Sequence, residues 1–178
     1  PLTSTHHKYG DTGYVDNINN PTSGNTSQSP TDSPELTAAR ILSPLRDITF
    51  ADGKYSLVGP YAKCDDFEPP YDKACPVQES PNFDFTRTNL YFDAVNVYYD
   101  IDSFMRYVNK DLGISVTPFQ YKGGVAFDPH SVNGADNSFY SPYNGRLAFG
   151  QGGVDDAEDV AVVIHELGHG IHDWLTHG

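Results

Sequence analysis

The sequence predicts an α+β fold, and three observations support this prediction. Apolar residues recur at three- and four-residue steps over 89–112 and 155–171, as they do along amphipathic helices. Short apolar and aromatic stretches alternate with Gly, Pro and Asn turns over 48–58 and 124–149, which is typical of strands. The length, 178 residues, is sufficient for one domain with a real core.

Residues 1–45 are predicted to form an extended or flexible polar arm. They are rich in Ser, Thr, Asn, Pro and Gly and show little periodicity, so they can bury little apolar surface. Only 36–45 is expected to contact the core, and His6 and His7 are interpreted as a solvated pair rather than metal ligands. Residues 46–178 are expected to form the folded domain.

The elements of this domain follow in order along the chain. Segments 48–50 and 55–58 flank Asp52-Gly53, which predicts a β-hairpin, because Asp-Gly is favoured in tight two-residue turns. A long helix is predicted over 89–112, and Gly113 is suited to end it. Short strands are then predicted over 124–127, 137–140 and 146–149.

The last helix is predicted to begin at Asp155. Glu158 follows three residues later, which is the spacing of a reciprocal N-terminal cap. Further acidic residues, Asp156 and Asp159, fall in the first turn, where the helix dipole favours negative charge. Gly168 and Gly170 each cost about 1 kcal/mol of helix propensity relative to Ala. They are tolerable if the helix is buried and another segment approaches it closely.

This helix carries His165-Glu166-Leu167-Gly168-His169, the HExxH pattern of zinc peptidases. Residues four apart lie on one helical face, so His165 and His169 can offer imidazole nitrogens to one ion. Glu166 lies one position round the helix, where its carboxylate can act on a water molecule without being a ligand. The alternative is a buried helix whose histidines only form hydrogen bonds.

A catalytic zinc site needs a third protein ligand, and the sequence does not visibly supply one. The longer pattern HExxHxxGxxH fails, since His172 and Leu175 replace its Gly and last His. His172 shares the helical face of His165 but lies about 10 Å further along the axis. We therefore interpret His172 and His177 as surface or supporting residues, with ligation as the less favoured alternative.

The segment 165–174, HELGHGIHDW, resembles the active-site helix of thermolysin- and fungalysin-type zinc metallopeptidases, the gluzincins. Residues 137–140 and 145–150 are similar to that family's edge strand and to the strand that leads to the active-site helix. Residues 91–112 are similar to the long helix of its N-terminal lobe. The resemblance covers about residues 85–178 and is strongest at HExxH.

The resemblance implies the N-terminal lobe of a zincin: a twisted, mostly antiparallel sheet with a long backing helix and a C-terminal active-site helix. It implies Zn²⁺ on His165 and His169, with Glu166 as the catalytic base. A glutamate on a later helix would complete the site, so a C-terminal lobe is expected in the polypeptide that follows. Calcium is a second candidate cofactor, with no assignable ligands.

The function expected from this site is zinc-dependent endopeptidase activity, weak or absent in residues 1–178 alone. Peptides would add as an extra strand along 137–140, with Asn137, Ser138 and Tyr140 as substrate-binding residues, unless this segment is a plain loop strand. Two other classes stay open. One is a non-catalytic extracellular binding or adhesion module, and the other is a different zinc hydrolase such as an aminopeptidase.

Charge and cysteine content limit the partners and the location. The net charge of −13 argues against nucleic acid and anionic membrane surfaces as partners. No run of 18 apolar residues could span a membrane. Cys64 and Cys75 are predicted to form a disulfide, as suits a secreted protein. The alternative is two free thiols in a cytosolic chain.

Overall fold

The computed structural model of the protein describes residues 3–8, 34, 40–153 and 155–177. The helices are α3 (Phe92–Arg106) and α4 (Val160–Thr176), and a π-helical turn (Tyr107–Asp111) extends α3. Short 3-10 turns span Val132–Gly134 and Asp156–Glu158. The strands are β1 (Thr3–Lys8), β2 (Ile41–Arg46), β3 (Thr49–Ala51), β4 (Lys54–Ser56), β5 (Ala62–Cys64), β6 (Val77–Gln78), β7 (Val125–Ser131), β8 (Ser138–Ser141) and β9 (Arg146–Gly150).

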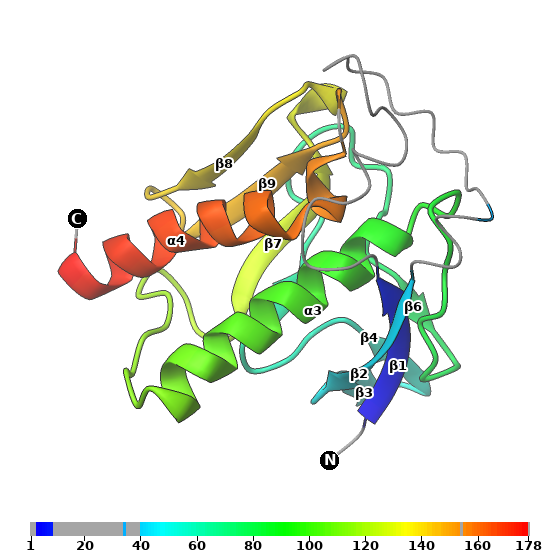
Figure 1. The fold of residues 1–178 in the computed structure, drawn as a ribbon, viewed down its shortest axis with the longest axis horizontal. Helices are drawn as coiled ribbons and strands as arrows, with labels where there is room; N and C mark the ends of the chain where they lie inside the picture. Colours follow the sequence, from blue (N-terminus) through cyan, green and yellow to red (C-terminus); the bar gives the residue numbers. More distant parts are fainter. Residues whose placement is uncertain (1–2, 9–33, 35–39, 154, 178) are drawn as a thin grey trace.

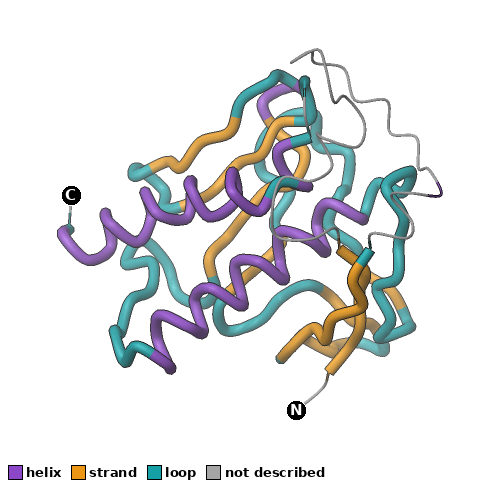
Figure 2. Tube along the Cα trace, viewed as in Figure 1, coloured by secondary structure: helices purple, strands orange, loops and turns teal. Residues whose placement is uncertain are grey.

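The centre of the molecule is a four-stranded sheet in the order β5-β7-β9-β8. Helices α3 and α4 lie side by side across one face of it (Figure 1). Two smaller sheets, β1-β2 and β3-β4-β6, lie to one side (Figure 2). This arrangement confirms the predicted α+β class. Fully buried side chains from both layers form the core, among them Val97, Tyr98, Ile101, Phe127, Leu147, Phe149, Val163 and Leu167.

The central sheet is mixed. Strand β7 pairs in parallel with both β5 and β9, and β8 joins β9 in the antiparallel sense at the edge. The parallel β5-β7 pair arises because α3 lies between these strands in the chain and returns it to the same end of the sheet. The smaller sheets are wholly antiparallel. Antiparallel pairing predominates among the described strands as a whole. The sheet beneath the helices, predicted to be mostly antiparallel, instead has two parallel pairs and one antiparallel pair.

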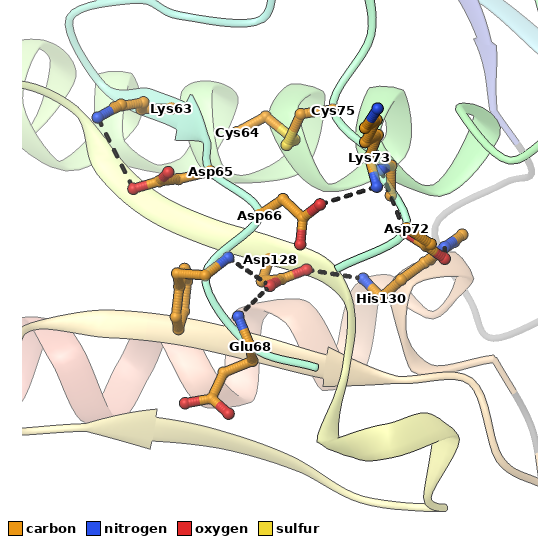
Figure 3. Close-up of a disulfide and its surroundings, with 12 residues drawn as sticks. Lys63, Cys64, Asp65, Asp66, Glu68, Asp72, Lys73, Cys75, Asp128 and His130 are labelled. Atoms are coloured by element: carbon orange, nitrogen blue, oxygen red, sulfur yellow. Dashed lines mark hydrogen bonds and ion pairs between the residues drawn. A yellow bond between two sulfur atoms is a disulfide. The ribbon is translucent and has the colours of Figure 1, made fainter. Parts of the chain in front are cut away.

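Strand β7 is buried along its whole length because both of its faces are covered. The helices cover one face, and a loop closed by the Cys64–Cys75 disulfide covers the other (Figure 3). The backbone N–H groups of Phe67 and Glu68 in this loop each donate to Asp128 of β7 at 2.8 Å. The predicted disulfide is thus confirmed, with 5.6 Å between the two Cα atoms.

The hairpin and the long helix form where the sequence predicts them. Strands β3 and β4 are joined by Asp52 and Gly53, which have φ values of 51° and 77°, as a tight hairpin turn requires. Helix α3 and its π-helical turn end at Asp111, and Gly113 follows two residues later with a φ of 67°. The side chain of Asn89 accepts the N–H of Tyr91 and so orders the turn before the helix.

The predicted polar arm falls partly outside the described residues, since 9–33 and 35–39 are not described. His6 and His7 lie in β1, which pairs antiparallel with β2. Strand β2 crosses the predicted boundary at residue 45, and the Leu45 side chain is buried in the core. Among the described residues, no helix is both long and apolar enough to cross a bilayer.

Candidate metal centre and cleft

Helix α4 begins at Val160 rather than at Asp155. The Ala157 N–H donates to the Asp155 carboxylate within a separate 3-10 turn, and the chain then bends at Asp159. The Ala161 N–H donates to the Asp159 carboxylate at 2.8 Å, which caps the helix proper. The predicted reciprocal cap from Asp155 to Glu158 is therefore wrong.

The reason is a tertiary contact. Arg87 donates through Nε to both carboxylate oxygens of Glu158, at 2.7 and 2.8 Å, and both side chains are buried. A charge-assisted pair of this kind is stronger than the capping bond that Glu158 would make to a backbone N–H. Glu158 therefore anchors the start of the helix to the segment before α3 instead of closing a cap.

His165 and His169 lie one helical turn apart, with their side chains turned toward each other. Their Nε2 atoms are 3.1 Å apart, and both side chains are exposed to solvent. Two nitrogens bound tetrahedrally to one zinc ion at 2.0–2.1 Å would be separated by about 3.3 Å. The two imidazoles are therefore placed so that one ion could bind both with little movement.

Glu166 lies beside the histidines and faces the sheet. Its side chain is largely buried and lines two adjoining hollows between α4 and β8. The first, of about 460 Å³, includes Asn137 and His165 in its lining. The second, of about 500 Å³, includes Tyr140 and His169. We refer to these two hollows together as the cleft, and Glu166 lies where they meet.

Strand β8 forms the wall of the cleft opposite α4. It is the edge of its sheet, since among the described residues it pairs only with β9. The predicted edge strand is thus present as Ser138–Ser141, with Asn137 just before it. The exposed Asn137 faces the first hollow, whereas Ser138 lies at both hollows and donates through Oγ to Asp156 at 2.6 Å. Among these side chains, Asn137 is the most accessible.

The hydroxyl of Tyr140 is already engaged by other groups. It donates to Asp173 at 2.5 Å, and Gln120 donates through Nε2 to the same carboxylate oxygen at 3.1 Å. Trp174 in turn donates to Gln120 at 3.1 Å. Burial and the hydrogen bond to Asp173 raise the pKa of Tyr140, so the phenol stays neutral. This network joins β8 to the C-terminal half of α4, and only the ring of Tyr140 is available to a ligand.

Sequence reasoning did not identify Asp173, Gln120 and Trp174 as part of this cleft wall. Asp173 lies seven residues after Glu166, a spacing that returns to the same helical face and could have identified it. No local pattern points to Gln120, which lies in a loop 20 residues before Tyr140.

Gly170 allows the close approach of helix and strand that the sequence suggested. A Cβ atom at this position would lie 2.8 Å from the Trp174 ring and 3.2 Å from the Tyr140 ring. A Cβ atom at Gly168 would meet nothing within 4 Å. The structure therefore explains Gly170 by packing and gives no such reason for Gly168.

The other histidines of α4 are not grouped with the first two. His172 is exposed and lines the second hollow together with His169. His177 ends the helix in the left-handed conformation, with its ring 5.4 Å from that of Phe119. Among the described residues, no further His, Cys, Asp or Glu joins His165 and His169 in a group of three candidate metal ligands.

A second set of candidate ligands lies near the start of α4, where Asp93, Asp155 and Glu158 bring carboxylate oxygens within 4.8 Å of one another. Burial raises the pKa of Asp155 well above its usual value, and the charges of Asp93 and Glu158 raise it further. Arg87 pairs with Glu158, and His130 contacts Asp93 at 2.5 Å. Arg87 and His130 thus already compensate much of the negative charge of these three carboxylates.

Comparison with known proteins identifies no family. No protein-family model matches the sequence, and no curated protein matches it either. The functional interpretation therefore depends on the HExxH helix and on the cleft beside it.

Proposed function

We propose that this chain carries the active-site helix of a zinc-dependent endopeptidase. The observation that carries the proposal is the position of Glu166, one residue from His165 and at the junction of the two hollows of the cleft. A base at this position could act on a peptide bond whose flanking residues occupy the hollows on either side.

In this proposal His165 and His169 hold the zinc ion through their Nε2 atoms. When bound, zinc supplies Lewis acidity, which activates water and polarises the scissile carbonyl. The exposed imidazoles leave room for further ligands. A third protein ligand would come from another part of the polypeptide, and the resemblance to gluzincins favours a glutamate in a C-terminal lobe.

Glu166 would act as general base and then as general acid. Its carboxylate accepts a proton from the attacking water and passes it to the amine that leaves, which avoids forming an amide anion. The largely buried Glu166 side chain lines both hollows, which places its carboxylate beside a peptide bound in the cleft.

The substrate would bind as an additional strand along β8. This edge has backbone donors and acceptors without a partner strand among the described residues, and an extended peptide can pair with them. The exposed side chain of Asn137 and the backbone of Ser138 at this edge would bind the substrate main chain. Tyr140 would contribute its ring, since its hydroxyl is bound to Asp173.

A non-catalytic peptide-binding module is the second candidate function. It is favoured by one observation, namely that the described residues provide only two of the metal ligands. Such a module would use the same strand edge and cleft without hydrolysis. An extracellular location suits both candidates, since the disulfide is stable in an oxidising environment.

The test is Glu166→Gln in the complete polypeptide. We expect zinc content to stay at the wild-type level and peptide cleavage to fall by about 100-fold or more, because an amide cannot accept the proton. Glu79→Gln is a matched control, since Glu79 is exposed and lies outside the cleft. Near-normal cleavage by Glu166→Gln would refute the assignment, and absence of cleavage by the wild type would favour the binding module.

A further inference from the structure

The two hollows beside Glu166 differ in charge. The first is lined by the acidic residues Asp136 and Asp156 together with the small apolar residues Ala161 and Val162. No Lys or Arg is found in this lining among the described residues. The second hollow is lined mainly by the rings of Phe139, Tyr140 and His172 and by Pro142.

The first hollow carries negative charge that is open to solvent. Asp136 is exposed, and among the described residues no side chain or backbone N–H is hydrogen-bonded to its carboxylate. Asp156 is half-buried beside it and accepts the Ser138 hydroxyl. Burial raises the pKa of Asp156, and neighbouring carboxylates raise it further, those of Asp136, Asp159 and Glu166. Four acidic groups therefore influence this end of the cleft.

The position of Asp136 is fixed by the backbone around it. A Cβ atom added at Gly153, where φ is 69°, would lie 2.5 Å from the Asp136 carboxylate. One added at Gly152 would lie 2.4 Å from the Asp136 backbone nitrogen. The two glycines let the loop after β9 pack directly against Asp136, so this carboxylate is held at the rim of the hollow.

Asp173, the acidic residue at the second hollow that comes from the end of α4, differs from Asp136 in burial and in hydrogen bonding. Asp173 is buried and accepts hydrogen bonds from the Tyr140 hydroxyl and from Gln120. Its charge is therefore already solvated by the protein, and the rings beside it present an apolar surface. A substrate cation would therefore interact less favourably with Asp173 than with Asp136, whose carboxylate has no hydrogen-bond donor among the described residues.

We propose that the first hollow is a subsite for a cationic group of the substrate, bound by Asp136 and Asp156, while the second hollow takes an apolar side chain. This inference rests on the proposed peptidase function and extends it to the substrate class. The cation could be an internal Lys or Arg side chain or the free α-ammonium of the substrate, since both offer N–H donors and positive charge.

The test uses peptides that differ at one position, with Lys, norleucine or Glu on either side of the scissile bond and with free or acetylated N-termini. Cleavage is measured with the complete polypeptide as kcat/KM. Binding of the same peptides to Glu166→Gln is measured by fluorescence anisotropy. We expect Lys to be preferred over norleucine on one side only, by roughly two- to fivefold, and less so at high salt. If the cation is instead the terminal ammonium, the three peptides are cleaved alike, and acetylation lowers the kcat/KM of each by a similar factor.

Variants assign the effect to residues. Asp136→Asn should bring the ratio of kcat/KM for the Lys peptide to that for the norleucine peptide toward one. Asp136→Lys should reverse the charge preference, so that the Glu peptide is cleaved faster than the Lys peptide. Asp111→Asn, an exposed acid outside both hollows, should leave the preference unchanged. A preference that persists in an Asp136→Asn, Asp156→Asn double variant would overturn the proposal.

The two proposals fail separately. Equal cleavage of the Lys, norleucine and Glu peptides, with no difference between free and acetylated N-termini, would reject the cationic subsite and leave the peptidase intact. Cation-selective binding that depends on Asp136, without cleavage by the wild type, would reject the peptidase and leave a cation-selective peptide-binding cleft.

Discussion

At the scale of single residues, the cleft contains polar groups of two kinds. His165 and His169 are exposed, so their ring nitrogens are open to a ligand. The Tyr140 hydroxyl is held by Asp173, and the Ser138 hydroxyl is held by Asp156. The first kind is suited to bind a metal ion, and the second joins strand β8 to α4 and to the 3-10 turn before it.

A first prediction concerns Tyr140. Tyr140→Phe removes the hydroxyl that donates to a buried carboxylate, so we expect the free energy of unfolding to fall by about 1–2 kcal/mol. Tyr143→Phe is the control. Tyr143 is 96% exposed, so removal of its hydroxyl should change the free energy of unfolding by less than about 0.5 kcal/mol. Urea unfolding followed by tryptophan fluorescence measures both, because Trp174 lies in the same network. Equal effects of the two substitutions would contradict the role of the hydrogen bond.

A second prediction concerns His130, whose two ring nitrogens contact Asp72 and Asp93. Figure 3 labels His130 and Asp72. Burial by itself lowers the pKa of His130, but hydrogen bonds and charges from the two carboxylates outweigh burial, so the pKa is raised overall. A raised pKa means that the folded state binds the proton more tightly than the unfolded state does. The resulting stabilisation is fully present below the unfolded pKa of about 6.5 and is lost as pH rises through the folded-state pKa.

The measurement is the difference in unfolding free energy between wild type and His130→Gln. This difference should shrink as pH rises from about 6.5 toward 9, because glutamine carries no proton to lose. A difference for His130→Gln that stays constant over this range would show that its two carboxylates do not hold a charged imidazole.

At the scale of elements, α4 contains a matched pair of glycines that tests how it packs. Gly170→Ala places a methyl group against the rings of Trp174 and Tyr140, and Trp174 cannot easily move because it is buried and hydrogen-bonded. We expect a loss of about 1–3 kcal/mol from overpacking. Gly168→Ala meets open space and should stabilise residues 1–178 by about 0.5–1 kcal/mol through helix propensity. Thermal unfolding of both variants is the measurement, and a stabilising Gly170→Ala would contradict the described packing.

The elements that could be predicted are those whose signals are local. Asp52-Gly53 specified the hairpin, and the apolar stripe of 89–112 with Gly113 after it specified α3. The start of α4 could not be predicted in the same way. Its apparent cap at Asp155 and Glu158 is a local pattern, but Arg87, 71 residues away in the chain, takes Glu158 for an ion pair.

At the scale of the whole molecule, the arrangement of strands depends on contacts that no local pattern contains. Three short strands were predicted from composition over 124–149, but their order in the sheet depends on where α3 and the disulfide loop return the chain. The cleft has the same origin. His165 and Glu166 were evident from spacing alone, whereas the wall opposite them, with Gln120 and Asp173, depends on the folding of β8 against α4.

The last prediction belongs to this scale and concerns zinc. If His165 and His169 are the zinc ligands, residues 1–178 offer the ion two imidazoles and no third protein ligand among the described residues. We therefore expect weak binding that either His165→Ala or His169→Ala abolishes. A longer polypeptide that includes the proposed third ligand should bind zinc more tightly, by more than the roughly 10–100-fold that an outer-shell partner contributes. Competition titration with a zinc-sensitive dye compares the two chains, and His172→Ala is the control that should leave both affinities unchanged. If the short chain binds zinc as tightly as the long one and loses that affinity in His172→Ala, the local histidines complete the site and no ligand from a second lobe is required.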